Sequence, residues 1–284
     1  MIQVSDLNYV YKKSGKLAVK QVNFDIKQGE IFGFLGPSGA GKTTTQRLII
    51  GLLRGYTGHI QVMGKERSAW GKGFYEDIGV AFDFPNLYLK LTALENLKLV
   101  SAYYKRKPTG FNTLLDRVGL LEDQHKKVES YSKGMKMRLN FIRALMHEPK
   151  LLFFDEPTSG LDPINGKIIK DTLLGLKSQG KTIFLTTHNM TVAEQLCDRV
   201  ALIVDGEIKE IDSPKNLTMR YGESAVKVEY MDGSQVKEAT FNLDSINHNQ
   251  SFMNVIQSKK ILTMHSGEAT LEDVFIKLTG RNLQ

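Results

Sequence analysis

A glycine-rich run after an apolar segment limits the folds open to this chain more than any other feature. Residues 36–43 read GPSGAGKT and directly follow the apolar segment Ile31–Leu35. The run matches G-x-x-x-x-G-K-[ST] in full, and we expect a helix from Lys42 to about Leu53. Glycine permits backbone angles that turn successive N–H groups inward, and a helix N-terminus favours anions. The sequence therefore predicts a strand, a phosphate-binding loop and a helix, the central unit of an α/β protein.

Each part of this loop has an expected task. Inward-facing backbone N–H groups would hold the phosphates of a nucleotide. The residues concerned are Gly36, Pro37, Ser38, Gly39, Ala40, Gly41, Lys42, Thr43 and Thr44. The Lys42 ammonium would reach the β- and γ-phosphates, and the Thr43 hydroxyl would bind Mg²⁺. Many NTPase families share this loop, so it predicts nucleotide binding without naming a family.

A second apolar segment ends in two adjacent carboxylates. LLFF at residues 151–154 precedes Asp155 and Glu156, at the end of a predicted strand, where α/β sheets bind ligands. We interpret Asp155 as the Mg²⁺ carboxylate and Glu156 as the general base or water-positioning group. His188 follows the predicted strand Thr182–Thr187, where it could contact the γ-phosphate. A lone His is more often structural, and the pattern alone leaves that alternative open.

The order of segments predicts the architecture. Alternating apolar and polar residues near the start indicate antiparallel strands, and residues 86–146 read as mostly helical. Strands then alternate with helices, as in a mostly parallel sheet. Among these helices, we expect one from Thr191 to Cys197 with Thr191 as its N-cap. We expect two parts, residues 1–222 and residues 223–284.

Three motifs in this order resemble those of the ATP-binding subunits of ABC transporters. They are GPSGAGKT at 36–43, YSKGM at 131–135 and LLFFDEPTSGLD at 151–162, and the resemblance covers about residues 1–220. It implies a P-loop NTPase (RecA-like) α/β core with a mostly parallel sheet. It further implies an antiparallel β subdomain, a helical subdomain insertion at about 86–146 and a small C-terminal α+β appendage. The implied activity is ATP hydrolysis that drives a membrane transporter.

The resemblance also assigns roles that the patterns do not. Tyr11 corresponds to the aromatic residue that stacks on adenine, although it could simply end a strand. Ser132 and Gly134 correspond to the signature positions that grip the nucleotide of a partner subunit. Asp162 belongs to a loop that contacts that partner. The resemblance therefore implies two ATP-binding subunits, identical or different, that close around two ATP molecules and move a transmembrane permease.

Two positions depart from the family's pattern. Asp83 stands where the family usually has Gln, after the predicted strand IGVAF. We expect it to remain in the Mg²⁺ shell through a water, or else to be a solvent-facing turn residue. The signature reads YSKGM rather than LSGGQ, with Lys133 and Met135 replacing Gly and Gln. Whether the active dimer is symmetric stays open at this point.

Two further segments point toward a membrane partner. The tail TLEDVFIKLTG resembles the C-terminal region of subunits that serve bacterial drug or peptide exporters. An apolar cluster could form a groove for an amphipathic permease element, or else close the core of the helical subdomain. Its members are Phe84, Leu87, Tyr88 and Leu89.

The composition limits where in the cell this protein is expected and which other functions remain possible. No run of about 18 apolar residues occurs, and the first residues lack the apolar stretch of a signal peptide. We expect a cytoplasmic protein held on the inner face of the cell membrane by its permease. The net charge of +7 fits a solvated surface or attraction to anionic lipid, and we expect no nucleic-acid partner. The alternative functions are a soluble ABC-type ATPase and a nucleotide-dependent switch not coupled to transport.

Overall fold

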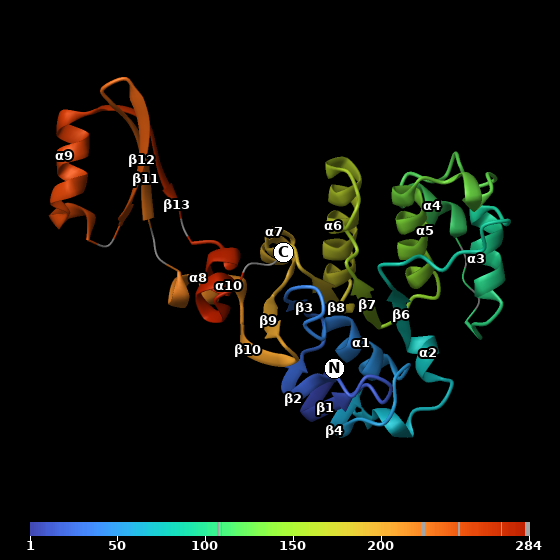
Figure 1. Ribbon diagram of the computed structural model, residues 1–284. Coiled ribbons are helices and arrows are strands. Elements are labelled where there is room, and N and C mark those ends of the chain that lie inside the picture. The colour runs from blue at the N-terminus through green and yellow to red at the C-terminus, as the bar shows by residue number, and fades with distance from the viewer. Residues whose placement is uncertain (107, 109, 223–224, 244, 268, 282–284) are drawn as a thin grey trace. The chain divides into compact units, whose positions relative to one another are not determined.

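The chain folds into two compact units. The computed structural model describes residues 1–106, 108, 110–222, 225–243, 245–267 and 269–281. The first unit comprises Met1–Ile211, and the second begins at Asp212. Figure 1 shows the elements of each unit along the chain.

A six-stranded sheet forms the centre of the first unit, with the strand order β10-β9-β3-β8-β7-β6. Its strands are β3 Ile31–Leu35, β6 Ile78–Ala81, β7 Leu151–Asp155, β8 Thr182–Thr187, β9 Arg199–Val204 and β10 Glu207–Asp212. The pairs β3–β8, β3–β9, β7–β8 and β6–β7 are parallel. Every residue of β3, β7 and β8 is buried, which is typical of parallel strands covered on both faces. The predicted α/β fold class is confirmed.

Helices cover both faces of this sheet (Figure 1). On one side lies α1, Lys42–Ile50, which ends at Gly51 in the left-handed conformation. On the other side lie α6, Pro163–Ser178, and α7, Met190–Leu196. The prediction for α7 was wrong at its start. The N-cap is Asn189, whose side chain accepts a hydrogen bond from the Val192 N–H, because Asn caps a helix better than Thr does.

An antiparallel sheet packs on the α1 side through a shared apolar core. Its strand order is β2-β1-β4-β5, and the strands are β1 Ile2–Val10, β2 Leu17–Ile26, β4 Thr57–Val62 and β5 Lys65–Glu66. A 3₁₀ turn, η1 Arg67–Ala69, and a short helix, α2 Phe74–Asp77, then lead back to β6. This sheet is the predicted antiparallel β subdomain.

The predicted helical insertion consists of α3 Ala93–Ser101, α4 Phe111–Arg117 and α5 Lys133–Leu145. A 3₁₀ turn, η2 Val128–Ser130, precedes α5. A capping box begins α3, because the Thr92 side chain accepts from the Glu95 N–H and the Glu95 side chain accepts from the Thr92 N–H. The apolar cluster does not close the core here, since Phe84, Tyr88 and Leu89 are 73%, 51% and 49% exposed.

The second unit combines helices with a small antiparallel sheet. Two helices, α8 Pro214–Tyr221 and α10 Leu271–Thr279, contact each other. The sheet order is β12-β11-β13, with β11 Ala225–Asp232, β12 Gln235–Asn242 and β13 Lys260–Gly267. Helix α9, Gln250–Ser258, packs on it and follows the 3₁₀ turn η3, Ile246–His248. Within the described residues, none of the helices combines the length and the apolar character needed to cross a membrane.

Candidate active site

The glycine-rich loop leaves the carboxyl end of the central strand β3 and enters α1. Gly39 and Gly41 have φ of 79° and 108°, so they require the left-handed region that glycine favours. Gly36 is not needed for a left-handed backbone conformation, unlike Gly39 and Gly41. Its φ is not positive, but a Cβ there would collide with the backbone oxygen of Ile203. No side chain caps the N-terminus of α1 and its first turn holds no acidic residue, which leaves its N–H groups available for an anion.

Lys42 supplies a buried positive charge at the start of α1. Its ammonium donates hydrogen bonds to the carbonyl oxygens of Gly36, at 2.6 Å, and Pro37, at 3.0 Å. Burial lowers the pKa of Lys42, while the charges of Glu156 and Asp155 act in the opposite direction. A buried cation with only neutral acceptors in direct contact favours an incoming anionic group.

Asp155 lies at the end of β7, buried between two hydroxyl groups. The Thr43 hydroxyl donates to its carboxylate, 2.9 Å from Oδ2, and the Thr186 hydroxyl donates to Oδ1. Burial raises the pKa of Asp155, these hydrogen bonds lower it, and the charges of Asp83 and Glu156 raise it again. The carboxylate therefore lies in a pocket with excess negative charge, where a cation would be stabilised.

Glu156 is held in an unusual backbone conformation beside His188. Its φ is 50°, and its N–H donates to the Thr186 carbonyl oxygen at 3.0 Å. One carboxylate oxygen accepts from the Thr187 hydroxyl at 3.0 Å, and the other lies 2.7 Å from Nδ1 of His188. Strained backbone at a strand end is frequent at functional sites. The two contacts hold the carboxylate of Glu156, which lines the same cavity as the glycine-rich loop.

Tyr11 reaches the site from the antiparallel sheet. Its hydroxyl lies 3.0 Å from the Thr44 hydroxyl, and its N–H donates to the Lys16 carbonyl oxygen at 3.0 Å. Lys16 and Ala18 also line the site, and the sequence reasoning missed both. The turn between two alternating strands, with Gly15 at φ 64°, is the signal that could have brought them to attention.

These residues surround one cavity of about 610 Å³. It brings together groups from five places in the chain: Tyr11, the glycine-rich loop from Ser38 to Thr44, Asp83, the pair Asp155 and Glu156, and His188. Ser159 lines it as well. The cavity size lies within the range of small-molecule sites.

Six of the predicted site residues do not line this cavity. Gly36, Pro37 and Ala40 belong to the glycine-rich loop but are not among the lining residues, and the other three lie elsewhere in the chain. Ser132 accepts from the Met135 N–H as the N-cap of α5, and Asp162 is the N-cap of α6. Gly134 lies beside Leu161, and the Lys133 side chain lies over Gly160, 3.4 Å from where a Cβ would be. The structure thus gathers the signature and the loop near Asp162 into a second group, outside the cavity.

The side chains in the cavity can supply only some of the oxygen ligands that a divalent cation needs. Thr43 offers a hydroxyl, and Asp155 and Asp83 offer carboxylates. Within the described part of the chain, no cluster of three or more His, Cys, Asp or Glu side chains could hold a metal by itself. This agrees with Mg²⁺ chemistry, since Mg²⁺ takes one or two carboxylates and completes its shell with phosphate oxygens and waters.

A strand, a phosphate-binding loop and a helix, with two carboxylates at the carboxyl end of another strand of the same sheet, define a P-loop NTPase. The ABC transporter family model matches residues 19–159, and a model described as the fluoroquinolone efflux ABC transporter C-terminal domain matches residues 224–268. The chain belongs to the ABC transporter family as one of its ATP-binding proteins, and its activity is ATP hydrolysis.

Individual relatives agree with this assignment. A fluoroquinolones export ATP-binding protein of Mycobacterium tuberculosis (strain ATCC 25618 / H37Rv) is 49% identical, covering 100% of this chain and 94% of that protein. A bacitracin transport ATP-binding protein of Bacillus licheniformis is 33% identical over 99% of this chain and 97% of its own. An ATP-binding cassette solved as a dimer in a post-hydrolysis state, bound to ADP and Pi, superimposes with a TM-score of 0.68. It is 30% identical and covers 75% of this chain and 98% of its own.

Proposed function

We propose that this chain hydrolyses ATP to drive a membrane exporter of drugs or peptides. The observation that carries the proposal is the convergence of Lys42, Asp155 and Glu156 on one cavity. The exporter class is supported by the C-terminal match and by relatives described as exporting fluoroquinolones and transporting bacitracin. Residues 1–222 would form the ATPase domain, and residues 223–284 an accessory region.

The residues of the cavity take distinct roles in this proposal. Tyr11 stacks on the adenine, and the loop from Gly36 to Thr44 binds the phosphates, with Lys42 on the β- and γ-phosphates. Thr43, Asp155 and Asp83 hold Mg²⁺, which supplies positive charge to the phosphate oxygens when bound. Glu156 positions and deprotonates the attacking water, and His188 contacts the γ-phosphate.

The second group, Ser132, Gly134 and Asp162, serves the nucleotide of a second ATP-binding subunit. Ser132 and Gly134 are at the start of α5, whose first turn carries no acidic residue, so this helix end attracts phosphate. Asp162 caps α6 next to Gly160, over which Lys133 lies. The Lys133 ammonium therefore lies beside the proposed interface with the second subunit. The second subunit could be an identical chain or a different one.

Asp83 is the residue that sets this site apart, and its substitution tests the metal assignment. Asp83→Ala should raise the Mg²⁺ concentration needed for half-maximal ATP hydrolysis by about tenfold, because a charge-assisted contact is lost. The measurement is a Mg²⁺ titration of phosphate release at saturating ATP. Asp116→Ala is the matched control, since Asp116 is exposed on α4 away from the cavity. An unchanged Mg²⁺ dependence of Asp83→Ala would reject the assignment.

The exposed cluster of Phe84, Tyr88 and Leu89 is the proposed docking surface for the permease. It follows Asp83 directly, so the partner and the nucleotide site would communicate through this segment. The permease would hold the chain on the inner face of the cell membrane. Such a surface suits an amphipathic element of the partner.

Tyr88→Ala should lower the permease-stimulated ATPase rate by about tenfold and leave the basal rate unchanged, because anchors of this kind dominate docking energy. The assay uses the permease that co-purifies with this chain from its native membrane, reconstituted in vesicles. Tyr103→Ala is the control, because Tyr103 is 77% exposed beyond the opposite end of α3. Equal losses of basal and stimulated rates in Tyr88→Ala would contradict docking at this surface.

A further inference from the structure

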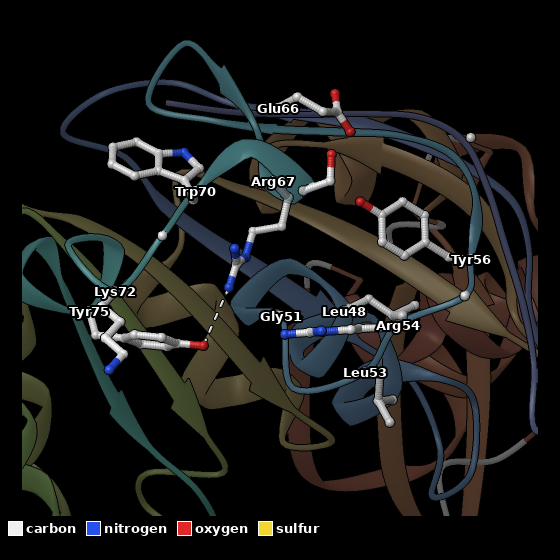
Figure 2. A pocket seen from close by; sticks show the side chains of 14 residues that line it. Leu48, Gly51, Leu53, Arg54, Tyr56, Glu66, Arg67, Trp70, Lys72 and Tyr75 are labelled. Carbon is white, nitrogen blue, oxygen red and sulfur yellow. Dashed lines mark hydrogen bonds between the residues drawn. The ribbon is translucent and has the colours of Figure 1, made fainter.

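The first unit contains a second large cavity, of about 670 Å³, that shares no residue with the nucleotide cavity. It lies between the C-terminal end of α1 and the segment that runs from β4 through η1 to α2 (Figure 2). Its size falls within the range of sites for small organic molecules.

Arg67 lines this cavity and is only 8% exposed. Its guanidinium donates to the carbonyl oxygens of Ile49, at 3.0 Å, and Ile50, at 2.5 Å, and it lies 4.2 Å from the centroid of the Phe74 ring. It also donates to the Tyr75 hydroxyl at 3.4 Å. These partners are all neutral. Among the described residues no carboxylate forms an ion pair with Arg67, so a buried positive charge is left without a counter-ion.

Arg54 brings a second positive charge to the same space. Figure 2 shows the Arg54 guanidinium and the Tyr75 hydroxyl pointing toward the region below Arg67. Within the described ranges, Arg54 has no hydrogen bond or ion pair. The lining holds three cations, Arg54, Arg67 and Lys72, against one carboxylate, Glu66. Two guanidinium groups and one ammonium that line the same cavity with a single carboxylate create a local potential that favours an anion.

Aromatic rings form the remaining walls. Tyr56, Trp70 and Tyr75 all line the cavity. Burial is the main reason why the pKa of Tyr56 is raised, so its hydroxyl stays neutral. Within the described structure this hydroxyl has no hydrogen-bond partner. Flat rings favour a flat apolar body, and the free hydroxyl offers one polar contact beside it.

From these observations we infer that this cavity binds small anionic aromatic molecules, of the class of aromatic carboxylates or sulfonates. The ring system would lie among Tyr56, Trp70 and Tyr75. The acid group would accept hydrogen bonds from the Arg54 guanidinium and from Nη1 of Arg67, since the hydrogen bonds found for Arg67 among the described residues use Nε and Nη2. This site is separate from the nucleotide cavity and does not depend on the proposed transport function.

Binding at this site can be followed by intrinsic tryptophan fluorescence, because Trp70 lines the cavity and is the only tryptophan of the chain. The probe is anilinonaphthalene sulfonate (ANS), which accepts excitation energy from tryptophan. Its neutral counterpart is phenylnaphthylamine, the same ring system without the sulfonate. We expect ANS to quench Trp70 emission saturably, and Arg54→Gln to weaken ANS binding by about tenfold through loss of a charge-assisted hydrogen bond.

Matched controls separate the site from general adhesion of the dye. Arg117→Gln removes the same charge from an exposed arginine on α4 and should leave ANS affinity unchanged. Phenylnaphthylamine should bind the intact protein and Arg54→Gln equally. Both variants should keep the intact protein's ATPase rate, which shows that they are folded. Equal ANS affinity of Arg54→Gln and the intact protein, or unchanged Trp70 emission with ANS bound, would overturn the inference.

Discussion

Glu156→Gln is expected to lower ATP turnover by about 10²–10⁴-fold, the usual contribution of a positioned general base. Gln is close in size to Glu and can still accept from the Thr187 hydroxyl, as Glu156 does at 3.0 Å. It cannot take a proton from water. ATP binding should therefore persist, and the variant should trap ATP unhydrolysed. The measurements are phosphate release under steady-state conditions and the ATP retained after rapid gel filtration.

The control for this prediction is Glu122→Gln, since Glu122 is exposed and outside the cavity. It should turn over ATP at the rate of the intact protein. A Glu156→Gln variant that hydrolyses ATP within about threefold of the intact rate would falsify the assignment of Glu156, given the size of general-base effects. If Glu156→Gln lost ATP binding as well as turnover, Glu156 would instead have a structural role in maintaining the site.

Lys42→Met should reduce both ATP affinity and turnover. Loss of a charge-assisted contact to the phosphates is expected to weaken ATP binding about 10–100-fold. Loss of a donor to the developing charge should lower turnover about 10²–10³-fold. Calorimetric titration with ATP and the phosphate-release assay measure the two effects separately.

The same substitution should change the free energy of unfolding by no more than about 1 kcal/mol. Burial lowers the pKa of Lys42, which means that the charge is partly disfavoured where it lies. Removing it relieves that cost while losing attraction to Asp155 and Glu156. Lys12→Met is the comparison, because Lys12 is exposed in the turn next to Tyr11 and should leave all three quantities unchanged. ATP affinity that survives in Lys42→Met would be inconsistent with the phosphate role.

Much of the fold could be predicted because its signals are local. The strand Thr182–Thr187 was predicted with its exact bounds, and the helix after the glycine-rich loop was predicted with its exact start at Lys42. Strand β12 and helix α9 were missed. Most residues of β12 are exposed, so the apolar periodicity on which prediction relies is weak in that strand. Helix α9 does carry an amphipathic pattern, with Phe252, Met253, Val255 and Ile256 half-buried on one face, and the sequence reasoning overlooked it.

Local patterns predicted the parts of the site whose residues lie next to each other in the chain, whereas Tyr11 and Asp83, which also line the cavity, were expected only through the family resemblance. By itself the sequence determined the glycine-rich loop and the pair Asp155 and Glu156, since the chemistry of each depends on adjacent residues. The tertiary structure alone decided their partners. Thr43 and Asp155 are 112 positions apart and meet because the Thr43 hydroxyl contacts both oxygens of the carboxylate, and Thr186 is 31 positions from Asp155.

The physical reason is the order of strands in the sheet. Strand β8 lies between β3 and β7, so its Thr186 comes to lie beside Asp155 at the shared carboxyl edge. Strand order depends on non-local pairing, which no local pattern encodes. The same holds for the second cavity. No sequence pattern connects Arg54 with Arg67, and only the folding of β4 and η1 against the end of α1 brings both into the lining of one cavity.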